Sequence, residues 1–222
     1  MLDVADVLEA RQRVMEVARR TSLDYSHTFS KTTGADVYLK LENLQRTGSF
    51  KIRGATNKLA HLDDDEREAG VVTASAGNHA QGVALAADRA GIDAKIVMPE
   101  YAPVSKVEAT RSYGAEVILH GIDYDAAQEK AHELEELEGR TYVHAFDDYD
   151  VMAGQGTLGL EIVEDQPDVE TVVVPIGGGG LISGVATAVK ANDPETRVVG
   201  VQAEGASAMA QSLEKGERVE TE

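Results

Sequence analysis

The sequence predicts an α/β protein built on mainly parallel sheets. Short runs of β-branched residues alternate with longer amphipathic stretches along almost the whole chain of 222 residues. Three of the amphipathic stretches are followed by a glycine, at Gly91, Gly114 and Gly139. Strands that alternate with helices pair in parallel through right-handed crossovers, and glycine supplies the left-handed cap that ends a helix before the next strand.

The expected elements follow one another in a regular order. Segments rich in β-branched residues are expected to form strands at residues 36–41, 71–74, 94–98, 116–119, 141–144, 171–175 and 197–202. Segments with apolar residues at helical spacing are expected to form helices at residues 4–20, 52–62, 79–90, 103–113, 124–138, 155–163 and 181–191. Ligands in such folds bind beyond the carboxyl ends of the strands, so the loops after the strands are the places to search for a site.

The composition excludes several classes of protein. Asp and Glu total 39 against 21 Lys and Arg, which gives a formal charge of −18; phosphates are bound by basic groups, so nucleic acid is not an expected partner. No stretch approaches the roughly 18 apolar residues of a membrane span, and the N-terminus lacks the apolar core of a signal peptide. Without Cys there is no disulfide or thiolate metal site. We expect a cytoplasmic protein that has no membrane partner, and the acidic runs at residues 63–66 and 133–138 fit solvated faces better than metal sites.

Lys51 stands in the segment LENLQRTGSFKIRGA, residues 41–55, after an aromatic residue and a turn-forming Thr-Gly-Ser. A free amine with a pKa of about 10.4 is mostly protonated, so a lysine is a nucleophile only where its surroundings favour the neutral form. The segment fits a lysine that forms a Schiff base with an aldehyde cofactor. Taken alone, the same position is also typical of a solvated surface charge at the start of a helix.

A second motif, Ser-Ala-Gly-Asn-His-Ala-Gln-Gly, follows the expected strand at residues 71–74. Small residues at a strand-to-helix turn leave backbone N–H groups open, and these suit a carboxylate or a phosphate. The alternative is an ordinary capped turn, in which Ser75 or Asn78 only satisfies the start of the helix. His79 could act as a base, although structural hydrogen bonds are the commoner use of a histidine in this position.

The third motif is a run of four glycines after the expected strand at residues 171–175. A run of glycines costs conformational entropy, and it lets backbone amides approach an anion closely at the start of the next helix. The run fits a phosphate site, but it matches neither G-x-G-x-x-G nor a Walker loop. Glu204, at the end of the next expected strand, resembles the acid that binds a ribose in dinucleotide sites, so NAD binding is the alternative for this motif.

The three motifs occur in one chain and in one order. This arrangement resembles the fold-type II pyridoxal-phosphate enzymes, and within them the serine/threonine dehydratase family, threonine ammonia-lyase in particular. The matching residues are 40–43, 49–55, 75–82 and 175–180, and the resemblance runs from about residue 23 to residue 216. It implies two three-layer αβα domains with mainly parallel sheets, as in the β chain of tryptophan synthase. Residues 1–48 and 147–222 would belong to a large domain and residues 49–146 to a small one.

The resemblance also implies roles for individual residues. Lys51 and Ser75 would be catalytic, Lys51 as the Schiff-base lysine that later removes the α-proton. Phe50 would stack on the ring of pyridoxal 5'-phosphate and Asn78 would bind its phenolic oxygen. The cofactor phosphate would be held by Gly177, Gly178, Gly179 and Gly180. The substrate carboxylate would be surrounded by Ser75, Ala76, Gly77, Asn78 and His79.

The activity implied by the resemblance is the deamination of L-threonine to 2-oxobutanoate and ammonia. An L-serine dehydratase and a serine racemase share nearly the same site and remain alternatives. Some relatives bind a cation through a glutamate at the position of Glu204, but the second carboxylate is absent here, so a monovalent ion or none is expected rather than a divalent one. Family members are commonly dimers or tetramers, and a homo-oligomer is expected if the chain is complete.

This chain is shorter than the catalytic domains of the family that it resembles. Catalytic domains of the family continue beyond this length, so the chain is expected to lack the C-terminal third of the large domain. Strand edges and apolar faces would then be uncovered. A different class of function is consistent with this, namely a truncated, non-catalytic relative that binds an anion or a partner chain.

Overall fold

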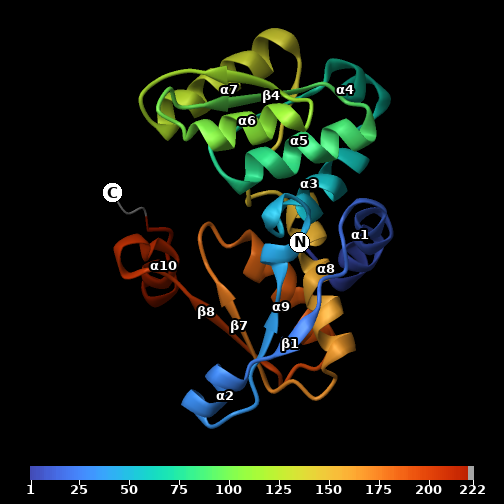
Figure 1. Cartoon of the computed structure of the whole chain (residues 1–222), viewed down its shortest axis with the longest axis vertical. Helices are drawn as coiled ribbons and strands as arrows, with labels where there is room; N and C mark the ends of the chain where they lie inside the picture. The colour runs from blue at the N-terminus through green and yellow to red at the C-terminus, as the bar shows by residue number, and fades with distance from the viewer. Residues whose placement is uncertain (220–222) are drawn as a thin grey trace. The chain divides into compact units, whose positions relative to one another are not determined.

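The computed structural model describes residues 1–219, which form two compact units (Figure 1). The lysine unit, which contains Lys51, runs from Gln12 to Val143, and the glycine unit combines Met1–Arg11 with the residues from His144 onward. The helices are α1 (Val4–Val17), α2 (His27–Thr33), α3 (Lys51–Ala60), α4 (Asp64–Ala69), α5 (Asn78–Ala90), α6 (Val104–Ser112), α7 (Tyr124–Glu138), α8 (Tyr149–Asp165), α9 (Gly180–Asn192) and α10 (Ala208–Lys215). The strands are β1 (Leu23–Tyr25), β2 (Tyr38–Lys40), β3 (Val71–Ala74), β4 (Ala94–Met98), β5 (Glu116–Leu119), β6 (Thr141–Tyr142), β7 (Thr171–Pro175) and β8 (Arg197–Val201).

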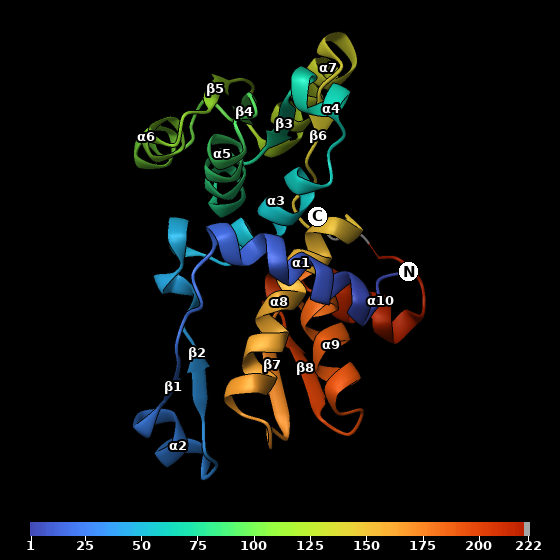
Figure 2. The same ribbon diagram turned by 90° about the vertical axis from the view of Figure 1, so that its right-hand side faces the viewer.

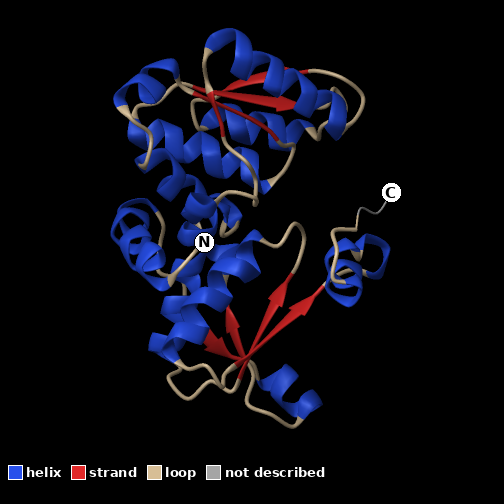
Figure 3. Ribbon diagram, turned by 180° about the vertical axis from the view of Figure 1, so that it is seen from behind, coloured by secondary structure: helices blue, strands red, loops and turns tan. Residues whose placement is uncertain are grey.

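The lysine unit is organised around a four-stranded parallel sheet in the order β5-β4-β3-β6. Strand β3 lies inside this sheet and is buried along its whole length. Parallel strands covered on both faces read as continuous apolar runs, which explains the Val-Val-Thr-Ala sequence of β3. Figure 3 shows the strands of this sheet between helices.

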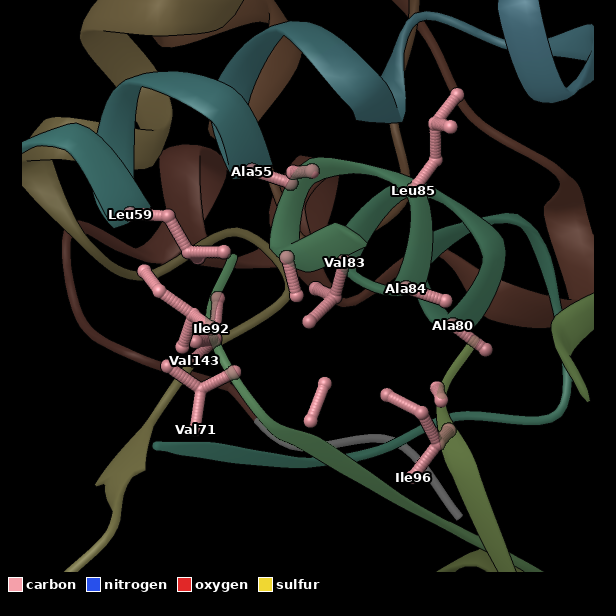
Figure 4. Close-up of a cluster of buried hydrophobic side chains, with 14 of the residues drawn as sticks. Ala55, Leu59, Val71, Ala80, Val83, Ala84, Leu85, Ile92, Ile96 and Val143 are labelled. Carbon is pink, nitrogen blue, oxygen red and sulfur yellow. The ribbon is translucent and has the colours of Figure 1, made fainter. Parts of the chain in front are cut away.

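Each face of this sheet packs on its own helices because side chains alternate along a strand. One face, with Val71 of β3 and Ile96 of β4, packs against α3 and α5 in a single apolar cluster, and Figure 4 shows part of it. The other face, with Val72 and Val97, packs against Ala127 and neighbouring apolar residues of α7. The result is a three-layer arrangement, and α5, which follows β3, lies in the layer that contains α3.

The segment between α1 and α3 carries an antiparallel pair that the sequence did not predict. Strands β1 and β2 pair from Leu23↔Lys40 to Tyr25↔Tyr38. The expected strand at residues 36–41 is therefore shorter than predicted and antiparallel to its neighbour. Helix α2 follows β1 and precedes β2 in the sequence, and Ser26 is its N-cap. The β1 run of three residues is too short to give a periodic signal, which is why it was missed.

In the glycine unit, β7 and β8 form a parallel two-stranded sheet in register from Thr171↔Arg197 to Pro175↔Val201. Figure 2 shows α8 and α9 beside these strands. Val172 and Val174 of β7 are buried, whereas Val173 between them and Val201 of β8 are exposed. The alternation shows that one face of this sheet is packed and that its other face carries exposed apolar side chains.

Helices α8 and α9 pack closely because glycines face one another across their contact. A Cβ built on Gly184 of α9 would clash with the carbonyl oxygen of Met152 and lie 2.5 Å from the backbone nitrogen of Gly156. A Cβ on Gly159 would lie 2.9 Å from the Cβ of Ala188. The two helices therefore touch through their backbones, and this close contact fixes how they pack against each other.

The predicted α/β class with mainly parallel sheets is confirmed, and most expected elements occur within one or two residues of their predicted bounds. Helix α8 is the largest difference, because it begins at Tyr149 rather than at residue 155. Asp148 explains this, since its side chain accepts hydrogen bonds from the N–H groups of Asp150 and Val151 at 2.8 and 3.1 Å and so caps the helix earlier. The predicted strand at residues 141–144 ends at Tyr142. The domain boundaries after residues 48 and 146 stay a prediction.

The first acidic run also has a structural use. Its residues lie at the start of α4, where Asp63 and Glu66 form a capping box with two hydrogen bonds of 2.9 Å. Acidic side chains at a helix N-terminus satisfy open N–H groups and the helix dipole. Within residues 1–219, none of the helices combines the length and the hydropathy that a membrane crossing requires.

The glycine contact between α8 and α9 gives a prediction about stability. Gly184→Ala should lower the free energy of unfolding by about 2 kcal/mol, because overpacking against a carbonyl costs about 3 kcal/mol and the gain in helix propensity is only about 1 kcal/mol. Urea denaturation would measure the difference. Gly205→Ala is the matched control, since a Cβ there meets open space. Equal stabilities of the two variants would contradict the prediction.

Candidate active site

The turn before Lys51 holds a strained backbone. Thr47 and Gly48 both have left-handed φ angles, of 64° and 71°. This conformation is uncommon for a β-branched residue such as threonine and costs on the order of 1–3 kcal/mol. Ser49 Oγ then accepts a hydrogen bond of 3.4 Å from the N–H of Lys51, and α3 begins at Lys51. The turn therefore places Lys51 at the first position of a helix.

Gly82 lets the next helix approach the backbone of Lys51. A Cβ built on Gly82 of α5 would lie 3.0 Å from the carbonyl carbon of Lys51 and 3.2 Å from its Cβ. Glycine inside a helix costs roughly 1 kcal/mol relative to alanine, so its presence indicates a close contact that a side chain would prevent. Helix α5 carries the second motif at its N-terminus, and this contact fixes that helix against the start of α3.

The surroundings of Lys51 favour its neutral form. Burial lowers the pKa of Lys51 from 10.5 to about 8, because desolvation destabilises the ammonium. Its Nζ lies 5.5 Å from the ring centroid of Phe50. The neutral fraction at neutral pH is thus far larger than that of a surface lysine, and a neutral amine can act as a nucleophile or accept a proton. The solvated surface charge considered from the sequence does not fit this environment.

An ion pair between Arg53, two residues after Lys51 in α3, and Glu42 anchors this helix to the preceding segment. Arg53 is 1% exposed and donates hydrogen bonds of 2.9 and 2.8 Å to the two carboxylate oxygens of Glu42. Arg53 also donates to the carbonyl oxygen of Arg19 at 3.2 Å, and the hydroxyl of Thr21 donates to Glu42 at 2.6 Å. Both charges are therefore held by several hydrogen bonds, as buried charges must be.

The loop after β3, residues 75–77, is an open turn and not an ordinary capped one. Helix α5 begins at Asn78 with Gly77 as its N-cap, and no side chain caps it. Ser75 Oγ instead accepts a hydrogen bond of 3.1 Å from the N–H of Gly77. The N–H groups of Ala76 and Asn78 donate to nothing in residues 1–219. The loop therefore presents open donors at the positive end of a helix, which suits a carboxylate or phosphate.

Two polar side chains beside this loop have defined partners. Lys106 donates a hydrogen bond of 3.3 Å to Oδ1 of Asn78. Because an ammonium only donates, this contact leaves the amide N–H groups of Asn78 facing away from Lys106. Nε2 of the buried His79 lies 3.0 Å from the carbonyl oxygen of Val143 and donates to it. The structural use of His79 considered from the sequence is therefore present.

The glycine loop, residues 177–180, lies in the other unit, between β7 and α9. Gly179 has a left-handed φ of 92° and is the N-cap of α9, which no side chain caps. Across the described part of the chain, nothing accepts a hydrogen bond from five consecutive N–H groups. These belong to Gly177, Gly178, Gly179, Gly180 and Leu181. Open amides at the start of α9, with the helix dipole behind them, suit an anion, and the anion site stays a prediction.

Glu204, the candidate cation ligand, is exposed at the start of the 3₁₀ helix Glu204–Ala206. Within residues 1–219, no group of three or more His, Asp or Glu side chains gathers in a geometry that could hold a metal ion. The monovalent ion stays a prediction.

Several contacts at these sites were not predicted. The pair Lys106–Asn78 joins residues 28 positions apart, and nothing in the local pattern connects them. Glu42 and Arg53 lie eleven positions apart within the segment 41–55, but the spacing alone does not predict that their side chains meet. Gly82 had a signal, because a glycine inside a strongly periodic helix indicates close packing. The sequence placed Lys51 and the two loops correctly after a turn or a strand, but it did not identify what holds them.

Comparison with known proteins identifies the family. The model of the pyridoxal-phosphate dependent enzymes matches residues 14–222. The chain belongs to this family. The predicted cofactor, pyridoxal phosphate, is confirmed by that match, and the alternative of NAD is not supported.

The chain is similar to proteins whose names give L-threonine as their substrate. It is 58% identical over 222 residues to L-threonine ammonia-lyase of Thermotoga maritima, which covers 99% of this chain and 55% of that protein. It is 52% identical over 214 residues to the catabolic L-threonine dehydratase of Escherichia coli K12, covering 96% of this chain and 65% of that protein. The chain thus spans less than two thirds of the length of these relatives.

Solved structures show the same fold. The processed form of threonine deaminase isoform 2 from Solanum lycopersicum superposes with a TM-score of 0.94 at 46% identity, over 97% of this chain and 59% of that one. Maize serine racemase superposes with a TM-score of 0.96 at 39% identity, over 99% of this chain and 67% of that one.

The described residues fit pyridoxal phosphate. Its phosphate requires several N–H donors, and the glycine loop offers a run of open backbone amides at a helix N-terminus. Its aldehyde requires a neutral amine, and Lys51 has a pKa of about 8. Both requirements are met by residues that the sequence had singled out.

The buried ion pair gives a second prediction about stability. Arg53→Met should lower the free energy of unfolding by about 3–5 kcal/mol, because it leaves the carboxylate of Glu42 without its cation. Arg11→Met is the matched control, since the Arg11–Glu164 pair is solvent-exposed on both sides and such pairs contribute about 1 kcal/mol or less. Chemical denaturation would compare the two, and similar losses would contradict the prediction.

Proposed function

We propose that this chain carries the cofactor-binding part of a lyase that deaminates L-threonine to 2-oxobutanoate and ammonia. The observation that carries the proposal is the lowered pKa of Lys51, about 8, in a chain of the pyridoxal-phosphate dependent family. The names of the relatives that are 58% and 52% identical support threonine as the substrate.

The proposed role of Lys51 follows from its neutral amine. Nζ of Lys51 would hold the cofactor through its aldehyde carbon, with release of water, and would accept the proton that leaves the substrate α-carbon. When bound, pyridoxal phosphate supplies an electron sink for the charge that this proton loss leaves behind. Phe50, whose ring is next to Nζ, is proposed to stack on the cofactor ring.

Binding roles are proposed for the two open loops. The amides of Ala76 and Asn78, aided by the dipole of α5, bind the substrate carboxylate. Ser75 already accepts a hydrogen bond from Gly77, which leaves its hydroxyl hydrogen to donate to substrate. Asn78, oriented by Lys106, would donate its amide N–H groups to the phenolic oxygen of the cofactor, and the glycine loop would hold the phosphate. Gly77 and His79 keep the shape of the carboxylate loop.

A second candidate function is supported by one comparison. Maize serine racemase has a TM-score of 0.96 with this chain, although its identity is lower than that of the threonine relatives. Racemisation and deamination both begin with removal of the α-proton, so the residues named above serve either reaction. The products distinguish them.

Attachment of pyridoxal phosphate to Lys51 is the first test. The purified protein is incubated with pyridoxal phosphate, reduced with borohydride and digested, and the modified peptide is located by mass spectrometry. We expect one major site, at Lys51, which Lys51→Ala removes and Lys130→Ala, on the surface of α7, leaves unchanged. A protein labelled at no residue, or equally at surface lysines, would be the non-catalytic relative instead.

The pKa of Lys51 predicts how fast this attachment occurs at each pH. Below pH 8 the initial rate should rise about tenfold per pH unit, because the neutral amine is the reactive form, and it should level off above about pH 9. A surface lysine with a pKa of about 10.4 would show no plateau in that range. Stopped-flow absorbance of the cofactor band measures the rate.

Substrate choice is tested with the cofactor-loaded protein. We expect 2-oxobutanoate from L-threonine at a higher kcat/KM than pyruvate from L-serine, and loss of both products in Lys51→Ala. Chromatography on a chiral column tests for D-serine in the same reactions. D-serine formation in excess of pyruvate would favour the racemase.

A further inference from the structure

The four residues of the glycine loop lie in different surroundings. A Cβ built on Gly177 would meet no atom within 4 Å, so the backbone there is open to a ligand. Gly179 requires glycine for its left-handed φ. A Cβ on Gly178 would clash with three atoms of the ring of Phe146, and a Cβ on Gly180 would lie 2.7 Å from the carbonyl oxygen of Phe146. Two of the four glycines are therefore needed because the loop lies against one aromatic residue.

Phe146 is itself held in place by a histidine. Nδ1 of His144 accepts hydrogen bonds from the N–H groups of Phe146 and Asp147, at 3.2 and 2.7 Å. The two rings meet edge to face, with centroids 4.6 Å apart and an interplanar angle of 83°. Two residues further on, Asp148 caps α8. The short segment from His144 to Asp148 is thus fixed at both ends, and its aromatic side chain is rigidly presented to the glycine loop.

We infer that Phe146 is a positioning residue for the phosphate of the cofactor. Its ring fills the volume beneath Gly178 and so fixes the path of the backbone whose amides are proposed to bind that phosphate. Phe146 lies against Gly178 and Gly180 and would act on the phosphate through this loop. The inference rests on the proposed function for the identity of the anion, while the packing of the ring against the loop is independent of it.

This inference is tested by enlarging the side chain at Gly178 and shortening the side chain at Phe146, singly and together. Gly178→Ala adds a methyl group where the ring stands, so the loop shifts and the Kd for pyridoxal phosphate should rise about tenfold. Phe146→Ala removes the ring and should raise the Kd a few-fold. In the double variant the added methyl group meets no ring. Introducing Gly178→Ala into Phe146→Ala should therefore raise the Kd for pyridoxal phosphate only about twofold or less.

Gly180→Ala is the matched control. Its Cβ would meet the backbone of Phe146 and not only the side chain, so Phe146→Ala cannot relieve the clash. Its loss of affinity should be the same in both backgrounds. Melting temperatures of all variants show whether they are folded.

The ligand pair pyridoxal phosphate and pyridoxal separates positioning of the loop from general destabilisation. Kd values for both are measured by absorbance titration, and only the phosphorylated ligand should be weakened by Phe146→Ala. Equal weakening of both ligands, or an equal cost of Gly178→Ala in the two backgrounds, would overturn the inference and leave the proposed function intact. A wild-type protein that bound pyridoxal phosphate no more tightly than pyridoxal would overturn both.

Discussion

The contact of α5 with the first turn of α3 is the constraint on which the lysine unit depends. Gly82 brings the backbone of α5 to van der Waals distance from Lys51, and a side chain at that position would displace one helix or the other. The same helix packs on β3 and begins with the open loop after it. The position of the Lys51 amine and the position of the open N–H groups at the start of α5 are therefore set by one rigid element.

The N-caps of the helices differ in whether a side chain satisfies the first N–H groups. Helices α2, α4, α7 and α8 begin with Ser or Asp side chains that accept hydrogen bonds from their first N–H groups. Helices α5 and α9 begin instead with Gly77 and Gly179, and no side chain caps them. Helices α3, α6 and α10 also lack a side-chain cap, but their N-caps are Phe50, Pro103 and Ser207. The glycine N-caps of α5 and α9 stand where a carboxylate or phosphate is proposed to bind. An aspartate there would compete with such a ligand for the same amides.

The sequence predicted the helices and strands that have a clear hydrophobic periodicity, and it predicted the motifs that follow a strand. Strand β3 and helix α7 have the bounds expected, because burial on both faces and helical spacing leave clear patterns. The short pair β1–β2 left no such pattern. For the site, Lys51 and the two loops could be identified locally, whereas the salt bridge between Glu42 and Arg53 could not. Although both residues lie in the segment 41–55, their contact depends on how the turn at Thr47 and Gly48 folds the chain back.

The open amides at α5 and α9 have a thermodynamic consequence. N–H groups that no side chain satisfies are left to water in the ligand-free protein, and a bound anion replaces that water. A ligand that binds only the folded state stabilises it by an amount that grows with the logarithm of its concentration relative to Kd. Pyridoxal phosphate bound at these amides, as proposed, would be such a ligand. The free energy of unfolding is then expected to rise with the concentration of the bound anion.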